Sequence, residues 1–435
     1  MTRLYLERIR ARNGALGAFV DVYGRSALRD ARAKDAAVRR GETLPAFHGV
    51  PTAVKDLNLV RGRWTRFGSR AVQFWSPVDD RSAASLRRGG FVLLGKTATS
   101  ELGAMPVTET DLHPPCRNPW DPSVTAGGSS GGAAAAVAAG LIPIAHGSDG
   151  GGSIRIPSSL CHLYGIKPSR GRVPNAYGFH DEHIIYTCGP IARGVRDAAA
   201  LLDVLAGLDV GRPHRLPAPP EHYARLVENN PQGLRIRLTL HGPITQTHPQ
   251  VAEAVQRVAR VLEELGHHVE EAAAPGGSVD EFLPIWQRQV ATAPVLFPSR
   301  LQPVTRWLRD AGRAITDAQA LEVQQRMSAR ILQVLEGADL WLTPTIPVPP
   351  PAVGAWKDLP PAEAFHRAAT LGAFTAPCNL TGAPAASIPA GLLDGRWPMG
   401  AQLAGHVGDE ATVLAVSRQL EVAMPWRDRW AATAR

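Results

Sequence analysis

Two glycine-rich stretches flank a run of alanines, and this arrangement constrains the fold more than any other feature of the chain. Residues 127–132 read GGSSGG, residues 133–139 read AAAAVAA and residues 147–153 read GSDGGGS. Alanine is the strongest helix former, whereas glycine adopts backbone conformations that other residues avoid. The pattern therefore predicts a loop, a short alanine-rich helix and a second loop in succession.

Outside this stretch, short helices alternate with short strands. Ser26–Arg40 is predicted to be a helix that ends at Gly41, and the apolar run Phe91–Leu94, bounded by glycines, is predicted to be a buried strand. Alternation of this kind is typical of α/β proteins. The rest of the chain continues it, with predicted strands at 234–240, 340–342, 385–388 and 400–404 and predicted helices at 251–265 and 410–423.

The composition indicates a globular chain without a membrane partner. Apolar residues make up 44% and charged residues 20% of the 435 residues, which are ordinary values for a folded protein. No apolar run reaches the roughly 18 residues that a membrane helix needs, and the N-terminus lacks the apolar segment of a signal peptide. The cysteines show no CxxC spacing, so neither disulfides nor a zinc cluster is expected. We expect a cytoplasmic protein.

The net charge of +8 does not by itself indicate a nucleic-acid partner, because the arginines are scattered rather than clustered. Lysine, by contrast, is rare. The 47 basic residues include only five lysines, which are Lys34, Lys55, Lys96, Lys167 and Lys357. Arginine does not lose its proton in a protein whereas a buried lysine can, so each of these lysines is a candidate for acid–base chemistry.

The second glycine stretch ends in a serine and has the features of a site for acyl transfer. Three successive glycines, Gly150, Gly151 and Gly152, let consecutive backbone N–H groups converge on one point. Such a point stabilises the oxyanion of a tetrahedral intermediate, with each donor contributing roughly 3 to 4 kcal/mol. Ser153 closes the loop as a candidate nucleophile, and Ile154–Pro157 is predicted to leave it as an extended segment.

A serine nucleophile needs a base, and no histidine lies at a spacing that would identify it as this base. A neutral lysine is the known substitute in Ser-Lys hydrolases. Lys55 lies in the apolar context Pro51–Leu59, where burial would lower the pKa of its amine. Ser129 could bridge Lys55 and Ser153 as a hydroxyl that accepts on one side and donates on the other. A structural, salt-bridged role for Lys55 is the alternative.

Three other motifs suggest different chemistry. Gly90–Thr97 matches the P-loop pattern of nucleotide-binding proteins, but a predicted strand occupies the place of the phosphate-binding loop. Gly127–Gly131 matches the nucleophile elbow G-x-S-x-G, but Asp121–Thr125 before it is a poor strand. His180–His183 lacks the spacing of the zinc motif H-E-x-x-H, which favours a polar loop. A nucleotide-binding protein that uses Gly90–Thr97 is the alternative from another functional class.

The order and content of the glycine motifs resemble the amidase signature family of serine hydrolases. The resemblance lies in GVPTAVKD at 49–56, GGSSGG at 127–132 and GSDGGGSIRIP at 147–157. It extends to GIKPSRGR at 165–172 and GPIAR at 189–193. Three ordered motifs at this separation are highly specific to the family.

The resemblance implies a Ser-cisSer-Lys triad in which Ser153 is the nucleophile, Ser129 follows a cis peptide bond and Lys55 is the base. It also implies that the backbone N–H groups of Gly150, Gly151, Gly152 and Ser153 form the oxyanion hole. The residues expected to support these groups are Ser130, Asp149 and Arg155.

The fold that the resemblance implies is α/β, with a central mixed β-sheet covered by helices on both faces. All of 1–435 is expected to form a single amidase domain. Residues 45–207 would be the catalytic signature core, 208–340 a variable, substrate-facing region and 341–435 the C-terminal part of the same fold. Two departures from the family's pattern are visible: Gly150 replaces a larger residue, and the chain starts late, so an N-terminal helix is expected to be absent.

We therefore expect an amidohydrolase that cleaves a carboxamide, or a related carbamate or ester, through an acyl-enzyme on Ser153. The resemblance implies no cofactor and no metal. The expected partner is a small-molecule amide, without nucleic acid, and the expected state is a monomer or homodimer. The alternative within the family is the amidase subunit of a tRNA-dependent amidotransferase, which needs partner subunits.

Several aromatic residues are candidates for lining the substrate pocket, with core packing as the alternative for each. They are Trp286, Phe297, Trp307 and those in Tyr177–Tyr186.

Overall fold

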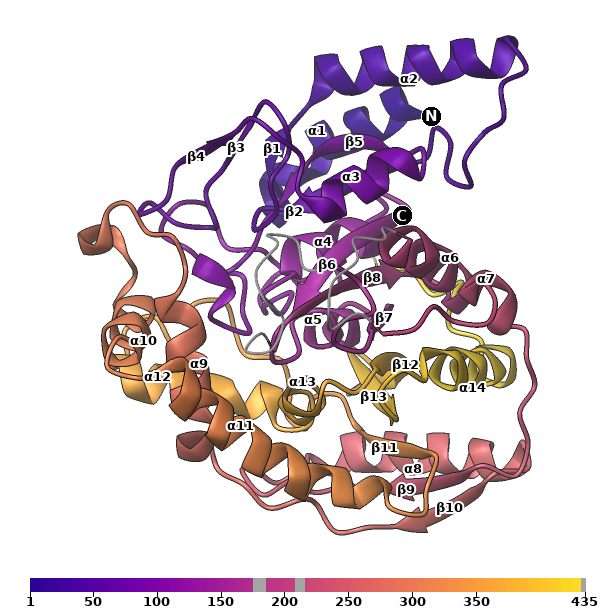
Figure 1. The fold of residues 1–435 in the computed structure, drawn as a ribbon, viewed down its shortest axis with the longest axis vertical. Helices are drawn as coiled ribbons and strands as arrows, with labels where there is room; N and C mark the ends of the chain where they lie inside the picture. The colour runs from indigo at the N-terminus through magenta and orange to yellow at the C-terminus, as the bar shows by residue number, and fades with distance from the viewer. Residues whose placement is uncertain (175–184, 208–215, 432–435) are drawn as a thin grey trace.

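The computed structural model describes residues 1–174, 185–207 and 216–431, which form a mixed α/β structure (Figure 1). The central sheet has eight strands, in the order β10 (His268–Glu271), β9 (Arg235–Leu238), β11 (Leu340–Pro344), β13 (Trp397–Gly405), β12 (Ala385–Leu393), β7 (Tyr164–Lys167), β8 (Thr187–Ala192) and β6 (Ile144–Asp149). Strands β10, β9 and β11 are parallel, and the other neighbouring pairs are antiparallel. The sheet is therefore mixed, as predicted.

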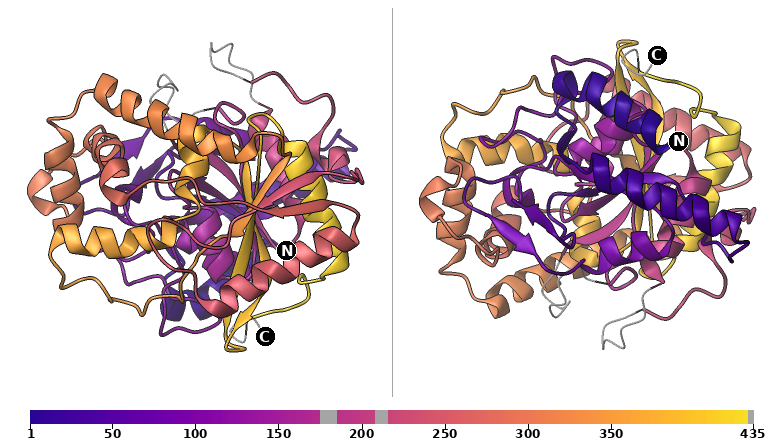
Figure 2. Two further views of the ribbon diagram at one scale, coloured as in Figure 1. Left: turned by 90° about the horizontal axis from the view of Figure 1, so that it is seen from below. Right: turned by 90° about the horizontal axis from the view of Figure 1, so that it is seen from above.

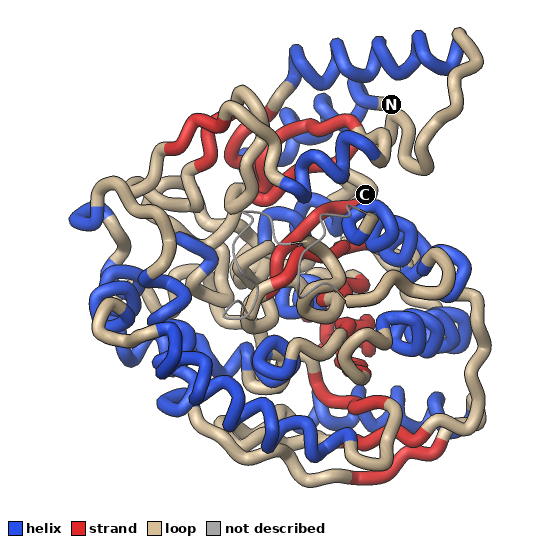
Figure 3. The backbone as a smooth tube through the Cα atoms, in the orientation of Figure 1, coloured by secondary structure: helices blue, strands red, loops and turns tan. Residues whose placement is uncertain are grey.

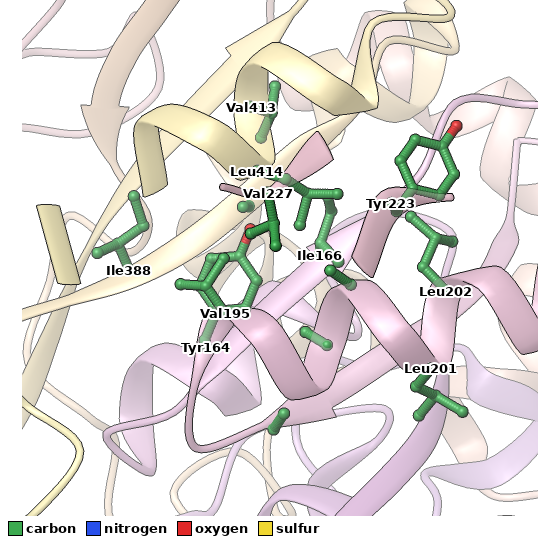
Figure 4. Packing of buried hydrophobic residues seen from close by; sticks show 14 of the residues in the cluster. Tyr164, Ile166, Val195, Leu201, Leu202, Tyr223, Val227, Ile388, Val413 and Leu414 are labelled. Carbon is green, nitrogen blue, oxygen red and sulfur yellow. The ribbon is translucent and has the colours of Figure 1, made fainter. Parts of the chain in front are cut away.

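Helices cover both faces of this sheet. Along β11, Leu340 and Leu342 pack in one apolar cluster, while Trp341 between them packs in another, because successive side chains of a strand point to opposite faces. The first cluster includes side chains from α6 (Val195–Ala206), α8 (Pro249–Glu264) and α14 (Glu410–Ala423), several of which are drawn in Figure 4. The second includes side chains from α9 (Val279–Ala291), α11 (Asp317–Leu332) and α13 (Ala376–Thr381). This arrangement confirms the predicted fold class.

The N-terminal part adds a second, three-stranded sheet beside the first. Its order is β1 (Phe19–Val22), β5 (Val92–Thr97) and β2 (Pro51–Lys55), and β2 is parallel to β5. Thr52 of β2 donates a hydrogen bond to the carbonyl of Ile144 at 2.9 Å, which joins the small sheet to the edge of the large one. Helices α2 (Gly24–Arg39) and α3 (Arg81–Arg88) flank the small sheet, and a hairpin of β3 (Arg63–Thr65) and β4 (Phe74–Ser76) extends from it (Figure 1).

The expectation that an N-terminal helix would be absent is wrong. Helix α1 (Thr2–Leu16) occupies this end of the chain and lies with α2 across the face seen from above in Figure 2. Ile9 and Leu16 of α1 pack against the small sheet and the alanine helix. The alternation of arginine with apolar residues at Met1–Arg12 is compatible with a helix that buries a narrow face.

The alanine-rich helix predicted between the two glycine loops is present, and a second helix that was not predicted follows the second loop. Helix α4 (Gly131–Ala138) is buried at every position, which confirms the alanine-rich helix. The extended segment predicted for Ile154–Pro157 is wrong, because helix α5 (Arg155–Leu160) begins there. The N–H of Ile156 donates to the carbonyl of Gly152 at 2.7 Å, and Pro157 is tolerated in the first turn, where its missing N–H is not needed.

A layer of helices away from the small sheet completes the structure. Helices α9, α10 (Pro303–Gly312), α11 and α12 (Pro361–Ala369) pack against one another, and the short helix α7 (Tyr223–Leu226) lies against α6. Figure 3 shows helices arranged around the strands. The C-terminal helix spans 410–423, as predicted.

Candidate active site

Lys55 is the last residue of β2, and its side chain is completely buried. Its Nζ lies 2.8 Å from Ser129 Oγ, 2.8 Å from Ser130 Oγ and 3.0 Å from Ser148 Oγ. Among the described residues, no carboxylate forms an ion pair with it. Burial disfavours the ammonium and lowers the pKa of the Lys55 amine to about 7. A substantial fraction of this amine is therefore neutral near neutral pH.

The first glycine loop directs two serine hydroxyls toward this amine. Gly127 has a positive φ of 80°, and the peptide bond between Gly128 and Ser129 is cis. Thr108 Oγ1 donates to the carbonyl of Gly127 at 2.8 Å and accepts the N–H of Gly131 at 3.1 Å, which ties the two ends of the loop together. Because the loop begins α4 without a preceding strand, it does not form the elbow of the G-x-S-x-G motif.

The second glycine loop is shaped by the buried carboxylate of Asp149. Its Oδ1 accepts the N–H of Gly152 at 2.7 Å, and its Oδ2 accepts the N–H of Ile154 at 3.1 Å. Arg155 donates to both oxygens, at 2.8 and 3.0 Å. Burial alone would raise the pKa of the Asp149 carboxyl, but the charge and hydrogen bonds of Arg155 outweigh burial and hold that pKa well below its usual range.

The loop presents fewer free donors than the sequence suggests. Since the N–H of Gly152 already donates to Asp149, it is not available to a substrate. The N–H groups of Gly150, Gly151 and Ser153 have no acceptor among the described residues. Thr375 Oγ1 donates to the carbonyl of Gly151 at 2.7 Å and thereby orients the peptide unit that follows Gly151. A Cβ at Gly152 would lie 2.2 Å from the same Oγ1, so only glycine fits there.

Two residues from the C-terminal part, Asn379 and Gln402, complete this support and were not found from the sequence. Asn379 Nδ2 donates to the carbonyl of Asp149 at 2.9 Å and to its Oδ1 at 3.0 Å. Arg155 donates to Asn379 Oδ1 at 2.7 Å and to Gln402 Oε1 at 2.6 Å. All four side chains are buried. The only local signal was a polar residue within apolar context, such as Gln402 in the predicted strand 400–404.

The structure brings the predicted site residues into one region. Lys55 contacts Ser129, and the N–H of Ser130 donates to the carbonyl of Ser153 at 3.1 Å, which links the two serine loops. Within the described residues, the hydroxyls of Ser129 and Ser153 form no direct hydrogen bond to each other. Hydrogen bonds between catalytic groups are often long in structures without a ligand and shorten when substrate binds.

A pocket opens at this region, with Gly151 and Ser153 in its wall. The space between the protein atoms that line it, its open mouth included, is about 1030 Å³. Gly103 also lines it, and a Cβ there would lie 3.5 Å from Ser129 Oγ, so the pocket also reaches the neighbourhood of the second serine.

The aromatic residues predicted to line the pocket fall into different places. Trp286 lines it. Trp307 packs in an apolar cluster with Phe365, and Phe297 is 37% exposed away from the wall. Of the stretch 177–186, residues 177–184 lie outside the described residues.

The described residues do not support the nucleotide-binding and metal-binding alternatives. Gly90–Thr97 contains the buried strand β5, and Lys96 within it pairs with Asp56 at 3.2 Å, so the stretch forms no phosphate-binding loop. His180–His183 lies outside the described residues. In the part of the chain that the structure describes, no group of three or more histidine, cysteine or acidic side chains is placed to hold a metal ion.

Comparisons with known proteins give the family of this chain. The amidase family pattern matches residues 1–414. A relative from Synechocystis sp., named "Putative amidase", is 38% identical over 97% of this chain and 84% of its own length. The solved structure of 6-aminohexanoate cyclic dimer hydrolase is 29% identical with a TM-score of 0.90, over 100% of this chain and 95% of that one.

A bacterial aryl acylamidase of the amidase signature family is similar too, at 29% identity and a TM-score of 0.87 over 100% of this chain and 94% of that one. The chain belongs to the amidase signature family, and it is a hydrolase of carbon–nitrogen bonds other than peptide bonds. As an amidase it acts on small-molecule amides. No helix among the described residues is long and apolar enough to span a membrane.

Proposed function

We propose that the chain hydrolyses a carboxamide, or a related carbamate or ester, through an acyl-enzyme on Ser153. The observation that carries the proposal is the buried Lys55 amine, which contacts Ser129 at 2.8 Å and has no carboxylate partner among the described residues. A neutral amine in this position can accept a proton, and burial makes the neutral form accessible near the working pH of an enzyme.

The reaction begins with proton transfer along the two serines. The Lys55 amine takes the proton of Ser129, Ser129 takes that of Ser153, and Ser153 Oγ bonds to the carbonyl carbon of the substrate. The N–H groups of Gly151 and Ser153, which lack protein acceptors among the described residues, donate to the resulting oxyanion. When the intermediate collapses, the carbon–nitrogen bond breaks and the leaving nitrogen receives the proton through the same relay.

Water then attacks the ester that the acyl group forms with Ser153. Lys55 and Ser129 accept the proton of this water and return a proton to Ser153, so the enzyme regains its starting state and the carboxylic acid leaves. Ser130, Asp149 and Arg155 hold the two loops in place during both steps. This scheme uses no metal and no cofactor.

We also propose that the chain works as one domain, with 208–340 facing the substrate. The pocket beside Ser153 takes residues from the signature core, such as Met105, and from the C-terminal part, such as Phe374. Between them, Ile244, Phe282 and Met327 come from the region that matches the family's motifs least. This distribution supports a fixed reaction centre combined with a variable wall.

The test is covalent labelling with a fluorophosphonate, which reacts with activated serine nucleophiles. We expect an equimolar adduct, located on Ser153 by peptide mass spectrometry. The Ser153→Ala variant is the control and is expected to remain unlabelled. An adduct on Ser129 would overturn the assignment of the nucleophile.

A further inference from the structure

The pocket beside Ser153 contains no charged side chain among the described residues that line it. Its wall consists of glycine, alanine, proline, serine and large apolar residues. The large side chains are Met105, Ile156, Ile244, Val279, Phe282, Trp286, Met327, Ile331, Trp341, Phe365, Phe374 and Leu380. Apart from the reacting serine, only Ser278 and the two indole groups provide polar side-chain atoms.

Each of these polar groups already has a partner within the protein. Ser278 is the N-cap of α9 and accepts the N–H of Glu281 at 3.1 Å. The indole N–H of Trp286 donates to the carbonyl of Ala104 at 3.0 Å, and that of Trp341 donates to Thr239 Oγ1 at 2.9 Å. Apart from the O–H of Ser278, these described side chains therefore present ring faces and aliphatic groups to a ligand.

The charged groups next to this wall are paired with one another. A Cβ at Gly277, which lines the pocket, would lie 3.4 Å from an Arg330 nitrogen and 3.9 Å from a Glu281 oxygen. These two side chains form an ion pair at 2.6 Å, and Arg326 lies 3.8 Å from the same carboxylate. The two arginines share this carboxylate behind the wall, and neither of them lines the pocket.

We propose, on the basis of the function given above, that this pocket binds an uncharged, apolar substrate group and rejects a carboxylate or an ammonium at the same position. A charge placed among these apolar groups would lose its hydration and gain no counterion from the described lining residues, which disfavours its transfer strongly. Free glutamine carries both charges close to its amide. It is accordingly a poor substrate, which argues against the amidotransferase alternative.

The experiment compares two matched series of amides, of which the first consists of p-nitroanilides that share one leaving group. This acyl series consists of butyryl-, succinyl- and 3-aminopropionyl-p-nitroanilide, in which a terminal methyl, carboxylate or ammonium group follows the same two methylene groups. A second series keeps the butyryl group and varies the amine among butylamine, 4-aminobutyric acid and 1,3-diaminopropane. We expect kcat/KM to fall by about 100-fold or more on adding either charge in at least one series, which also identifies the side that enters the pocket.

A variant pair tests whether the wall itself is responsible. Ile244 is half-buried in a loop outside the helices and strands, so a lysine there leaves the elements intact. Ile244→Lys is expected to reduce the discrimination against the carboxylate by about tenfold, whereas the neutral control Ile244→Gln is not, because only lysine supplies a counterion. Equal discrimination in the two variants would overturn the proposal.

Two fluorophosphonates separate failure of this proposal from failure of the proposed function. One carries an octyl chain, and the other carries the same chain with a terminal carboxylate. Faster labelling of Ser153 by the neutral reagent supports the proposal. Equal labelling rates, or equal kcat/KM values in both amide series, overturn it while leaving the nucleophile assigned. Absence of any adduct on Ser153 overturns the proposed function, and with it the inference that rests on it.

Discussion

The C-terminal ends of two neighbouring strands each carry a fully buried lysine, but their surroundings differ. Strands β2 and β5 are parallel, with Lys55 opposite Thr97 and Lys96 opposite Val54. Lys96 contacts the carboxylate of Asp56 at 3.2 Å, whereas Lys55 contacts three serine hydroxyls and a carbonyl. The same residue type at nearly the same depth thus lies beside a carboxylate in one place and among hydroxyl groups in the other.

The two lysines differ in their partners rather than in their burial. A carboxylate within hydrogen-bonding distance favours the ammonium form of a buried lysine, whereas hydroxyl groups supply no such charge. The sequence left open a structural, salt-bridged role for Lys55. In the structure it is Lys96, and not Lys55, that forms such an ion pair. The hydroxyls around Lys55 satisfy its hydrogen bonds without supplying a negative charge, so the amine can exchange a proton.

The largest expected effect is the loss of turnover when the amine is removed. Lys55→Ala should lower kcat by a factor of about 10² to 10⁴, the range of acid–base catalysis, while circular dichroism shows a folded protein. Lys55→Arg should fail equally, because arginine keeps the charge but does not release a proton. Near-normal turnover in Lys55→Arg would make Lys55 a structural cation like Lys96.

The matched change at the other strand should affect stability rather than chemistry. Lys96→Met keeps most of the side-chain volume but leaves the buried Asp56 carboxylate without its counterion. Breaking a buried pair in this way costs about 3 to 5 kcal/mol of unfolding free energy. Denaturant unfolding measures this loss, and the turnover of the folded fraction should fall far less than in Lys55→Ala. A variant that is stable but inactive would contradict the comparison.

A smaller effect is expected where a side chain acts on the site only through the second glycine loop. Asn379→Ala removes the hydrogen bonds to Asp149 and should lower kcat by about 10- to 100-fold with little change in KM, below the 10² to 10³ of a direct oxyanion donor. Gln324→Ala is the control, because Gln324 is a buried amide that bonds Leu380 instead. Equal losses in both variants would indicate a general packing effect.

Local sequence patterns indicated the proposed reaction centre but not the residues that support it, because the two depend on interactions of different range. The motif around Lys55 and the serine loops are local patterns, and the flanking apolar residues already indicated that the lysine is buried. Asn379 and Gln402 contact Arg155 across 224 and 247 residues of sequence, where no local pattern records the pairing.

The local structure of Ile154–Pro157 was also mispredicted, because contacts with distant parts of the chain determine it. Helix α5 has only six residues, and isolated helices of that length are unstable in water, so Ile154–Pro157 looked extended. Hydrogen bonds from Ile154 to Asp149 and from Arg155 to Gln402 hold its first turn in place. The Asp149 carboxylate also accepts the N–H of Gly152, whereas the glycine pattern predicted that this N–H would be a free donor.

The pH dependence of turnover should report Lys55 directly. In the proposed mechanism the amine works in its neutral form, and its pKa is lowered to about 7, so activity should rise about tenfold per pH unit below that value and stay level above it. The sign follows from deprotonation, since raising the pH increases the neutral fraction. A profile of kcat/KM against pH, with a substrate that does not titrate in this range, measures it. A rate that falls as the pH rises through 7 would exclude Lys55 as the base.

The smallest and most specific effect comes from removing one hydroxyl beside each lysine. Ser148 Oγ lies 3.0 Å from Lys55 Nζ, and Thr65 Oγ1 lies 3.0 Å from Lys96 Nζ. A hydroxyl that accepts a hydrogen bond from an ammonium stabilises the charged form, so Ser148→Ala should favour the neutral amine. The midpoint of the pH profile should then move to lower pH by less than about one unit, equivalent to roughly 1 kcal/mol for a single hydrogen bond.

Thr65→Val removes the equivalent hydroxyl from Lys96 and should leave that midpoint unchanged, because Lys96 has no part in the proposed proton relay. Since Ser148 also bonds Lys55 through its carbonyl, which the substitution retains, the amine keeps its position and the plateau rate should change little. A shift of the same size in both variants would mean that the profile reports the charge of the whole region. A shift confined to Ser148→Ala would identify Lys55 as the group that titrates.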